Sequence, residues 1–199
     1  MKILIACEYS GRVRDAFIAQ GHQAISCDFM PTEIDGPHIQ GNVLDVLDQE
    51  WDMMIAHPSC TYLTNSGVQW LHRDASRWAK LDQACEFFNR LLDAPIKRIC
   101  IENPIPHKYA IERLHGRKYS QLIQPYMFGH METKATCLWI KGLEKLNPTS
   151  DLKVQTMALP DGQRQRLHWL SPSPTRWKDR SRTYQGIATA MAKQWGRFR

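Results

Sequence analysis

Short apolar runs alternate with helical periods along most of the chain. The runs KILIAC, WDMMIA and IKRICI are nearly continuous, as in strands that are buried on both faces of a sheet, and each is followed or preceded by turn residues. We therefore expect strands at residues 2–7, 22–27, 38–40, 51–56, 96–101, 122–128 and 135–140.

Helical periods fill several of the segments between these strands. Residues 73–93 repeat apolar side chains at i, i+3, i+4 and i+7, the pattern of an amphipathic helix. Gly21 ends a shorter helical pattern that follows the first strand, and further helices are expected near 109–114 and 183–195. Residues 145–182 contain many prolines and are predicted to be irregular.

Strands that alternate with helices indicate an α/β fold, with a mostly parallel sheet and helices on both faces. In such a sheet the carboxyl ends of the strands share one edge, and ligands bind there. Polar or reactive residues follow four of the expected strands. They are Tyr9, Ser10, Gly11, Asp28, Phe29, Pro58, Ser59, Cys60, Glu102, Asn103 and Pro104. A shared site explains four such strand ends better than four unrelated turns.

Length and composition define the class of protein. With 199 residues, of which 43% are hydrophobic and 23% charged, we expect a single globular domain over residues 1–199. No apolar run approaches the ~20 residues of a membrane span, and the first residues do not form a signal peptide. We therefore expect a cytoplasmic protein without a membrane partner.

Six cysteines are spread along the chain without a C-x-x-C pair or a nearby group of histidines. A disulfide framework and a metal site are therefore both unexpected. Most of the thiols lie in apolar runs, as buried small hydrophobic residues do. Cys60 differs because it lies in an expected loop among turn residues.

Positive charge is concentrated near the C-terminus. The formal net charge is +6, and residues 163–199 hold nine basic residues against Asp179 alone. Tryptophans are interleaved with these charges, a combination suited to holding a phosphate backbone and stacking bases. Arg164 and Arg166 are candidates for substrate contact on this basis. A solvated surface that keeps the protein soluble is the alternative interpretation.

Taken in order, the motifs resemble the catalytic core of the cytosine-5 DNA methyltransferase family. The resemblance lies in Tyr9, Ser10 and Gly11 (Phe-Ser-Gly or Phe-Ala-Gly in the family), Asp28 and Phe29 (an acid and an aromatic residue), Gly41, Asn42 and Val43 (Gly-Asp-Ile), Pro58, Ser59 and Cys60 (Pro-Pro-Cys), and Glu102, Asn103 and Pro104 (Glu-Asn-Val). Residues 124–143 and 180–195 also resemble small phage-encoded cytosine methyltransferases that lack a target-recognition domain.

This resemblance implies a Rossmann-like class I methyltransferase fold, S-adenosyl-L-methionine as cofactor and DNA as partner. The implied cofactor-binding residues are Tyr9, Ser10, Gly11, Asp28, Phe29, Asn42, Val43 and Pro58. Cys60 would add to C6 of cytosine, because C5 is too weak a nucleophile until a thiolate pushes electron density onto it. Glu102 would stabilise the charge that develops near N3, and Asn103 would contact the substrate.

Several positions depart from the family pattern. Ser59 replaces the proline before the nucleophile, and Asn42 replaces an acid. The family's Gln-x-Arg-x-Arg element corresponds to residues 132–136, which contain no arginine. His57 could tune the thiol of Cys60 or hold a phosphate, but a lone histidine at a strand end more often has a structural role.

Three functions compete on this evidence. The first is a DNA cytosine-5 methyltransferase, acting on duplex or single-stranded DNA. The second is a methyltransferase for a free pyrimidine nucleotide, which suits the absence of a separate recognition domain. The third is a non-catalytic protein that keeps the fold and binds nucleic acid or cofactor.

Overall fold

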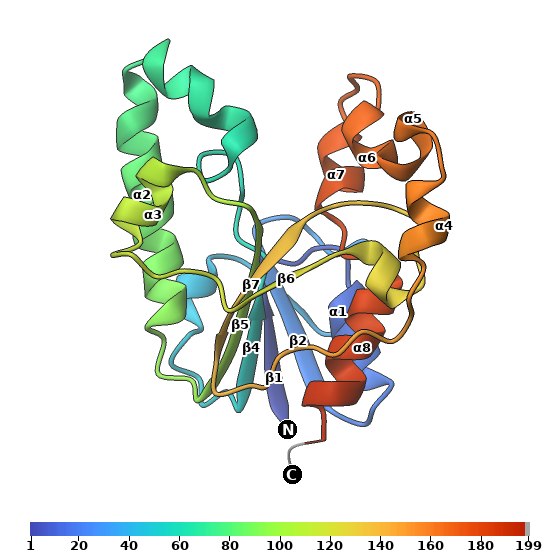
Figure 1. Ribbon diagram of the computed structural model, residues 1–199. Coiled ribbons are helices and arrows are strands. Elements are labelled where there is room, and N and C mark those ends of the chain that lie inside the picture. Colours follow the sequence, from blue (N-terminus) through green and yellow to red (C-terminus); the bar gives the residue numbers. More distant parts are fainter. Residues whose placement is uncertain (198–199) are drawn as a thin grey trace.

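A seven-stranded sheet of order β3-β2-β1-β4-β5-β7-β6 organises the chain in the computed structural model, which describes residues 1–197 (Figure 1). The strands are β1 (Lys2–Ala6), β2 (Gln23–Asp28), β3 (His38–Gln40), β4 (Met53–Ala56), β5 (Arg98–Pro104), β6 (Gln121–Ile123) and β7 (Thr136–Lys141). The strands β1 to β5 are parallel, whereas β7 is antiparallel to both β5 and β6.

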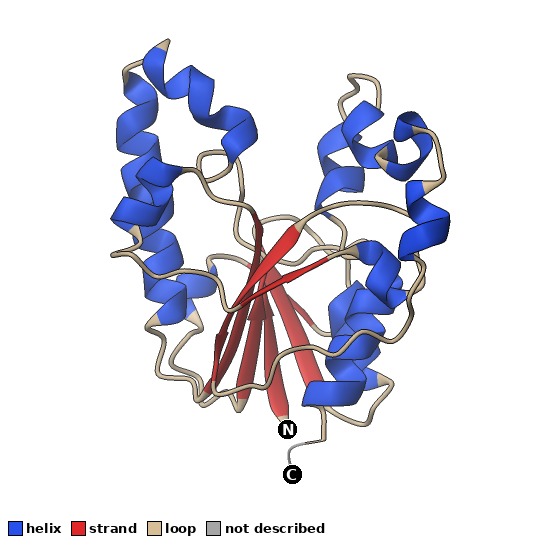
Figure 2. Cartoon of the chain, in the orientation of Figure 1, coloured by secondary structure: helices blue, strands red, loops and turns tan. Residues whose placement is uncertain are grey.

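Helices cover both faces of this sheet (Figure 2). On one face α1 (Arg12–Ile18) and α8 (Gln185–Trp195) pack against Ile3 and Ile5 of β1. On the other, α2 (Ser76–Leu92) and α3 (Lys108–Arg113) join the core that contains Leu4 and Ala6. Successive strand residues point to opposite faces, so the continuous apolar run of β1 supplies both cores. The α/β fold expected from the sequence, with a mostly parallel sheet and helices on both faces, is confirmed.

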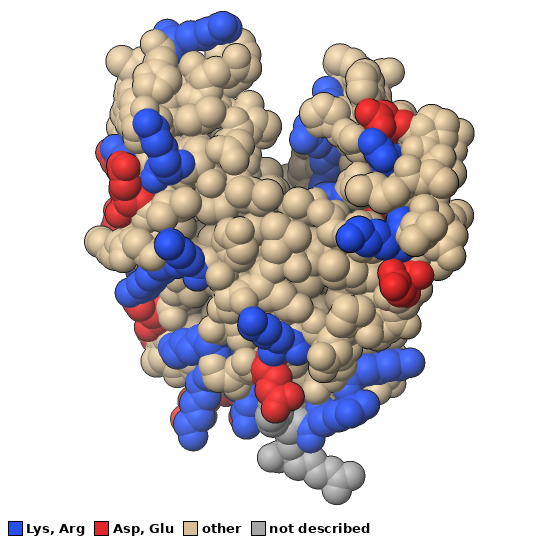
Figure 3. Space-filling view, in the orientation of Figure 1, with Lys and Arg blue, Asp and Glu red and all other residues tan. Residues whose placement is uncertain are grey.

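Two arms rise beyond the carboxyl edge of the sheet. The η2 arm is formed by the 3₁₀ helix η2 (Asn65–His72) and the start of α2. The C-terminal arm, residues 153–181, contains α4 (Lys153–Met157), α5 (Asp161–Arg164), α6 (Arg166–Trp169) and α7 (Arg176–Ser181). Figure 3 shows a deep hollow between the two arms, above the strand ends. The arms therefore form the walls of a groove over the expected site.

The C-terminal arm corrects one prediction, because residues 145–182 are not irregular throughout. Its helices have only four to six residues each. Helices of this length show no hydrophobic period, and they are marginal without tertiary contacts. Residues 198 and 199 lie outside the described residues. They include the end of the predicted domain range 1–199 and the basic residue Arg199.

The largest differences from the expected strand boundaries are at the ends of β6 and β5. Residues 122–128 form a strand only at their start, since β6 ends at Ile123 and the 3₁₀ helix η3 (Pro125–Phe128) follows. Pro125 lacks the N–H that a strand would donate. The strand β5 continues to Pro104 because its last residues pair with β7, so Glu102, Asn103 and Pro104 lie within the strand and not after it.

Candidate active site

The segment after β4 presents Cys60 at the carboxyl edge of the sheet. Asn103, buried in the neighbouring strand β5, donates a 2.8 Å hydrogen bond from its side-chain amide to the carbonyl of Pro58. This bond attaches the turn to β5 although Ser59 replaces the family's proline. Cys60 is exposed, whereas the other five cysteines are buried or half-buried. The structure thus agrees with the loop position expected for the thiol.

A buried ion pair lies beside this turn. His57 Nδ1 and Glu102 Oε2 are 3.0 Å apart, and the two side chains are 11% and 12% exposed. Burial would lower the pKa of His57, but the hydrogen bond and charge of Glu102 raise it. Burial would raise the pKa of Glu102, but His57, with help from Lys134 and Thr183, lowers it to about 2. The hydrogen bond and the opposite charges therefore favour an imidazolium paired with a carboxylate.

The thiol of Cys60 lies in a mixed electrostatic field. Removal of water by the surrounding protein raises its pKa, and the negative charge of Glu102 acts in the same direction. The positive charges of Lys134 and Arg180 oppose this rise without cancelling it. Because a thiolate is the reactive form, these two cations are the groups that favour reactivity here. Glu102, Lys134 and Arg180 therefore all lie within electrostatic reach of Cys60.

Lys134 and Thr183 are site residues that sequence reasoning missed. Lys134 Nζ donates a 3.0 Å hydrogen bond to the carbonyl of Arg180, and the Thr183 hydroxyl donates to Glu102 Oε2 over 3.4 Å. Lys134 lies in the segment 132–136 that corresponds to the arginine-containing family element, so a cation at that position was a usable signal. Thr183 carried no signal, because its distance from Glu102 in the sequence is 81 residues.

Tyr9 is covered by the C-terminal arm. Its hydroxyl is 2.8 Å from Ser181 Oγ and donates to the carbonyl of Lys178 over 3.1 Å. Its ring lies 5.6 Å from that of Trp177, measured between centroids. In this structure Tyr9 therefore docks α7 onto the end of β1. Contact between Tyr9 and a cofactor stays a prediction.

Ser10 and Gly11 shape the turn between β1 and α1. The Ser10 hydroxyl donates to the buried carboxylate of Glu8, which also accepts the backbone N–H groups of Val13 and Arg14 at the start of α1. Gly11 has a φ of 74°, and a Cβ there would lie 2.7 Å from the guanidinium of Arg14. Only glycine fits that left-handed, close-packed position. Both residues thus have structural roles, and their predicted contacts with cofactor are untested.

The second predicted cofactor element is more open. Asp28 ends β2, and its carboxylate accepts the backbone N–H of Met30 over 2.9 Å; burial raises its pKa. Phe29 has a side chain that is 71% exposed. Asn42 caps the 3₁₀ helix η1 (Val43–Asp45) by accepting the N–H of Leu44, and Val43 is buried. Among the predicted cofactor residues, Phe29 is therefore the exposed one, whereas Asp28 is half-buried.

Both predicted substrate arginines form ion pairs. Arg164 pairs with Asp161 within the C-terminal arm, and Arg166 reaches Glu132 with two nitrogens, at 3.1 and 3.2 Å. Together with Arg182, three of the basic residues at 163–199 are thus paired with carboxylates. Arg166 is still 53% exposed along its side chain, so it faces solvent as well as Glu132. Contact of Arg164 and Arg166 with substrate stays a prediction.

Residues 1–197 contain no group of three or more His, Cys, Asp or Glu side chains arranged to hold a metal ion. No helix in the same range is both long enough and apolar enough to span a membrane.

Comparisons with known proteins give a limited result. No protein-family model matches the chain, and no curated protein matches its sequence. Among solved structures, the chain is similar to a protein provisionally assigned as a DNA modification methyltransferase encoded within a prophage (E. coli), with 16% identity, a TM-score of 0.48 and coverage of 80% of this chain. It is also similar to the Entamoeba histolytica methyltransferase EhMeth, with 14% identity, a TM-score of 0.48 and coverage of 75%. The aligned part spans only 55% and 57% of those two chains, and likenesses this distant do not bear on chemistry.

Proposed function

We propose that the chain is an S-adenosyl-L-methionine-dependent methyltransferase that modifies C5 of cytosine in DNA through a transient adduct with Cys60. One observation carries the proposal: an exposed thiol and a buried His57–Glu102 ion pair lie on neighbouring strand ends, within electrostatic reach of each other. Nucleophilic addition to a pyrimidine needs a thiolate and a group that stabilises charge on the ring. The two strand ends supply the sulfur nucleophile and the charged pair.

Cys60 carries the covalent step. The thiolate forms a bond to C6, and the C5–C6 electron pair moves toward C5, which then takes the methyl group. A base removes the C5 proton, the double bond re-forms and the sulfur leaves C6. Lys134 and Arg180 assist by favouring the thiolate over the thiol.

Glu102 and His57 stabilise the charge that develops on the cytosine ring. Since Glu102 is ionised, its carboxylate can accept a hydrogen bond from the exocyclic amino group of cytosine. Negative charge that develops at N3 would be neutralised by the proton that lies between His57 Nδ1 and Glu102 Oε2, which are 3.0 Å apart. The proton donor would then be the His57–Glu102 pair and not a protonated Glu102 alone.

Asp28 and Phe29 fit one end of the cofactor. A carboxylate has about four lone-pair sites, so Asp28 can accept hydrogen bonds from ribose hydroxyls in addition to the N–H of Met30. The exposed Phe29 ring offers an apolar surface for adenine. Bound there, S-adenosyl-L-methionine supplies the methyl group.

The groove between the arms is where a nucleic-acid strand or a free nucleotide would reach the strand ends in this proposal. A non-catalytic role is the second candidate, favoured by the raised pKa of Cys60 and by the cover over Tyr9.

Mass spectrometry of DNA, RNA and nucleotides incubated with the protein and isotopically labelled S-adenosyl-L-methionine tests the proposal. We expect label in 5-methylcytosine from DNA. Label found solely in a free pyrimidine nucleotide would support the nucleotide methyltransferase instead. Cofactor binding without any labelled product would support the non-catalytic role.

Replacement of Asp28 should weaken cofactor binding. Asp28→Ala removes hydrogen bonds to a charged group, which are worth about 1.5–3 kcal/mol in total affinity. Titration calorimetry with S-adenosylhomocysteine measures the change. Asp48→Ala, which removes an exposed acid from the loop after η1, serves as control and should bind like the wild type. Equal affinity in the Asp28 variant would remove this residue from the cofactor site.

A further inference from the structure

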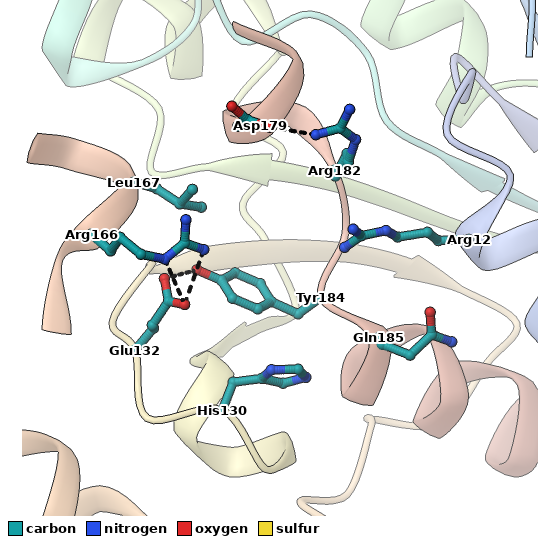
Figure 4. A pocket seen from close by; sticks show the side chains of 9 residues that line it. All are labelled: Arg12, His130, Glu132, Arg166, Leu167, Asp179, Arg182, Tyr184 and Gln185. Atoms are coloured by element: carbon teal, nitrogen blue, oxygen red, sulfur yellow. Dashed lines mark hydrogen bonds and ion pairs between the residues drawn. The ribbon is translucent and has the colours of Figure 1, made fainter. Parts of the chain in front are cut away.

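A polar cavity of about 410 Å³ opens beside the candidate active site (Figure 4). The C-terminal arm, the N-terminal ends of α1 and α8, and the segment 130–132 meet around it. Its walls carry three arginines, together with Glu132, Tyr184 and Gln185; the arginines are Arg12, Arg166 and Arg182. Its volume lies within the usual range of small-ligand pockets, about 300–1,000 Å³.

Two of the three arginines are balanced by carboxylates. Arg166 pairs with Glu132, while Arg182 pairs with Glu33 at 2.7 Å and also with Asp179. These contacts fix the two guanidinium groups in the cavity wall. Three carboxylates thus face two guanidinium groups, so these two arginines bring no excess positive charge to the wall.

Arg12 is different, because it forms no ion pair with a carboxylate among residues 1–197. Its Nη1 donates one 3.1 Å hydrogen bond to the carbonyl of Thr183, which leaves other N–H groups of the fork available. Figure 4 shows the guanidinium groups of Arg12 and Arg166 extending toward one another from opposite sides of the cavity, near the Tyr184 ring. The guanidinium of Arg12 therefore offers donors to the cavity without an ion-pair partner among residues 1–197.

The N-terminus of α8 adds a partial positive charge to the cavity wall. The helix has 11 residues, and its N-cap residue Tyr184 makes no side-chain cap, although the N–H of Gly186 donates to His130 Nε2 over 3.0 Å. The hydroxyl of Tyr184 is committed to Glu132 at 2.7 Å, whereas Gln185 contributes a further polar side chain to the wall. A helix N-terminus carries a partial positive charge that favours anions. A compact anion with several acceptor oxygens suits this combination of a guanidinium fork and helix end.

Thr183 connects the cavity to the catalytic pair. Its carbonyl accepts from Arg12, and its hydroxyl donates to Glu102. A pyrimidine beside Glu102 and an anion beside Arg12 would thus lie on two sides of one residue. In a nucleotide the base and the phosphate are likewise separated by one short group, the sugar that joins them.

We infer that the cavity binds the phosphate group of the target cytidine nucleotide, with Arg12 as its main ligand. The identity of the base rests on the proposed function; the anion site itself rests on the cavity and its arginines. The phosphate belongs either to a DNA strand or to a mononucleotide, and both present the same group to Arg12.

Binding measured without cofactor tests the inference. The probes are deoxycytidine, deoxycytidine monophosphate and a short single-stranded oligonucleotide with one cytosine, each titrated by calorimetry into the wild type, Arg12→Gln and Arg12→Lys. We expect the monophosphate or the oligonucleotide to bind at least tenfold more tightly than deoxycytidine. Arg12→Gln should remove about tenfold of that affinity, as loss of a charge-assisted contact implies, and leave deoxycytidine unaffected. Arg12→Lys should keep part of it, because the charge remains without the fork.

Arg90→Gln is the matched control. Arg90 is an exposed arginine near the end of α2, on the opposite face of the sheet from α1 and α8, so its loss should change none of the affinities. Thermal melting of each variant separates loss of binding from loss of fold, and Arg12→Lys covers the case in which Arg12→Gln unfolds.

The outcomes distinguish a polymer phosphate from a mononucleotide phosphate. They also distinguish failure of the phosphate site from failure of the proposed function. Arg12-dependent binding of the oligonucleotide alone assigns the phosphate to a polymer, and Arg12-dependent binding of the monophosphate extends the site to free nucleotides. Equal affinity for deoxycytidine and both phosphorylated probes would overturn the inference, as would an Arg12→Gln variant that loses only S-adenosyl-L-methionine affinity. Arg12-dependent phosphate binding by a protein that transfers no methyl group would refute the proposed function and leave the phosphate site standing.

Discussion

Cys60→Ala will form no covalent adduct with DNA that contains 5-fluorocytosine, whereas the wild type will be trapped on it when S-adenosyl-L-methionine is present. Fluorine at C5 cannot leave as a proton does, so the sulfur stays bonded to C6 after methyl transfer. Denaturing gels and peptide mass spectrometry detect the adduct and its position. The effect is all-or-none, because no other exposed cysteine occurs among residues 1–197.

Glu102→Gln should slow formation of the adduct by about 10²–10³-fold, the usual loss when a group that stabilises developing charge is removed. Glutamine keeps the shape of the side chain but cannot hold the ion pair with His57. Cys7→Ala is the matched control. Cys7 follows β1 near the same edge, and burial raises the pKa of its thiol strongly, so its loss should leave the adduct intact. An adduct on any cysteine other than Cys60 would refute the assignment.

The strands could be predicted because a buried parallel strand appears in its own sequence as a continuous apolar run. In β1, Ile3 and Ile5 face one helical layer, whereas Leu4 and Ala6 face the other. The boundaries that failed depended on partners far along the chain. The strand β5 extends to Pro104 because β7 pairs with it, and no property of residues 102–104 indicates a partner more than 30 residues away.

The site could be predicted in part for the same reason. Strand ends in a parallel sheet meet at one edge, so Cys60 and Glu102 could be expected near each other from their order alone. The pairing of His57 with Glu102 depends on two side-chain conformations across neighbouring strands, which no local pattern encodes. The contact of Trp177 with Tyr9 depends on how the short helices of the C-terminal arm dock, and those helices have no sequence period.

His57→Ala should lower the free energy of unfolding by about 3–5 kcal/mol at pH 6, because removing one partner leaves a buried charge uncompensated. Both side chains of the pair are roughly nine-tenths buried, so solvent screens the remaining carboxylate of Glu102 poorly. Urea denaturation followed by tryptophan fluorescence measures the loss. Asp82→Asn is the control, since it breaks the ion pair of Arg113 with an aspartate that is 59% exposed, and exposed pairs contribute about 0–1 kcal/mol.

The pH dependence of this difference identifies its cause. The pKa of Glu102 is lowered from 4.5 to about 2, so the stabilisation from its ionised form is present above pH 4.5 and is lost as the pH falls toward 2. The pKa of His57 is raised from 6.5, so the stabilisation from its protonated form is present below pH 6.5 and is lost as the pH rises through the raised value. The wild type should therefore exceed His57→Ala most between pH 4.5 and 6.5. The gap should narrow in acid, where Glu102 of the variant takes up a proton and its burial no longer costs a charge. A gap that is constant from pH 3 to pH 9 would mean that His57 and Glu102 interact as neutral groups, and His57 would then hold no proton for the cytosine ring.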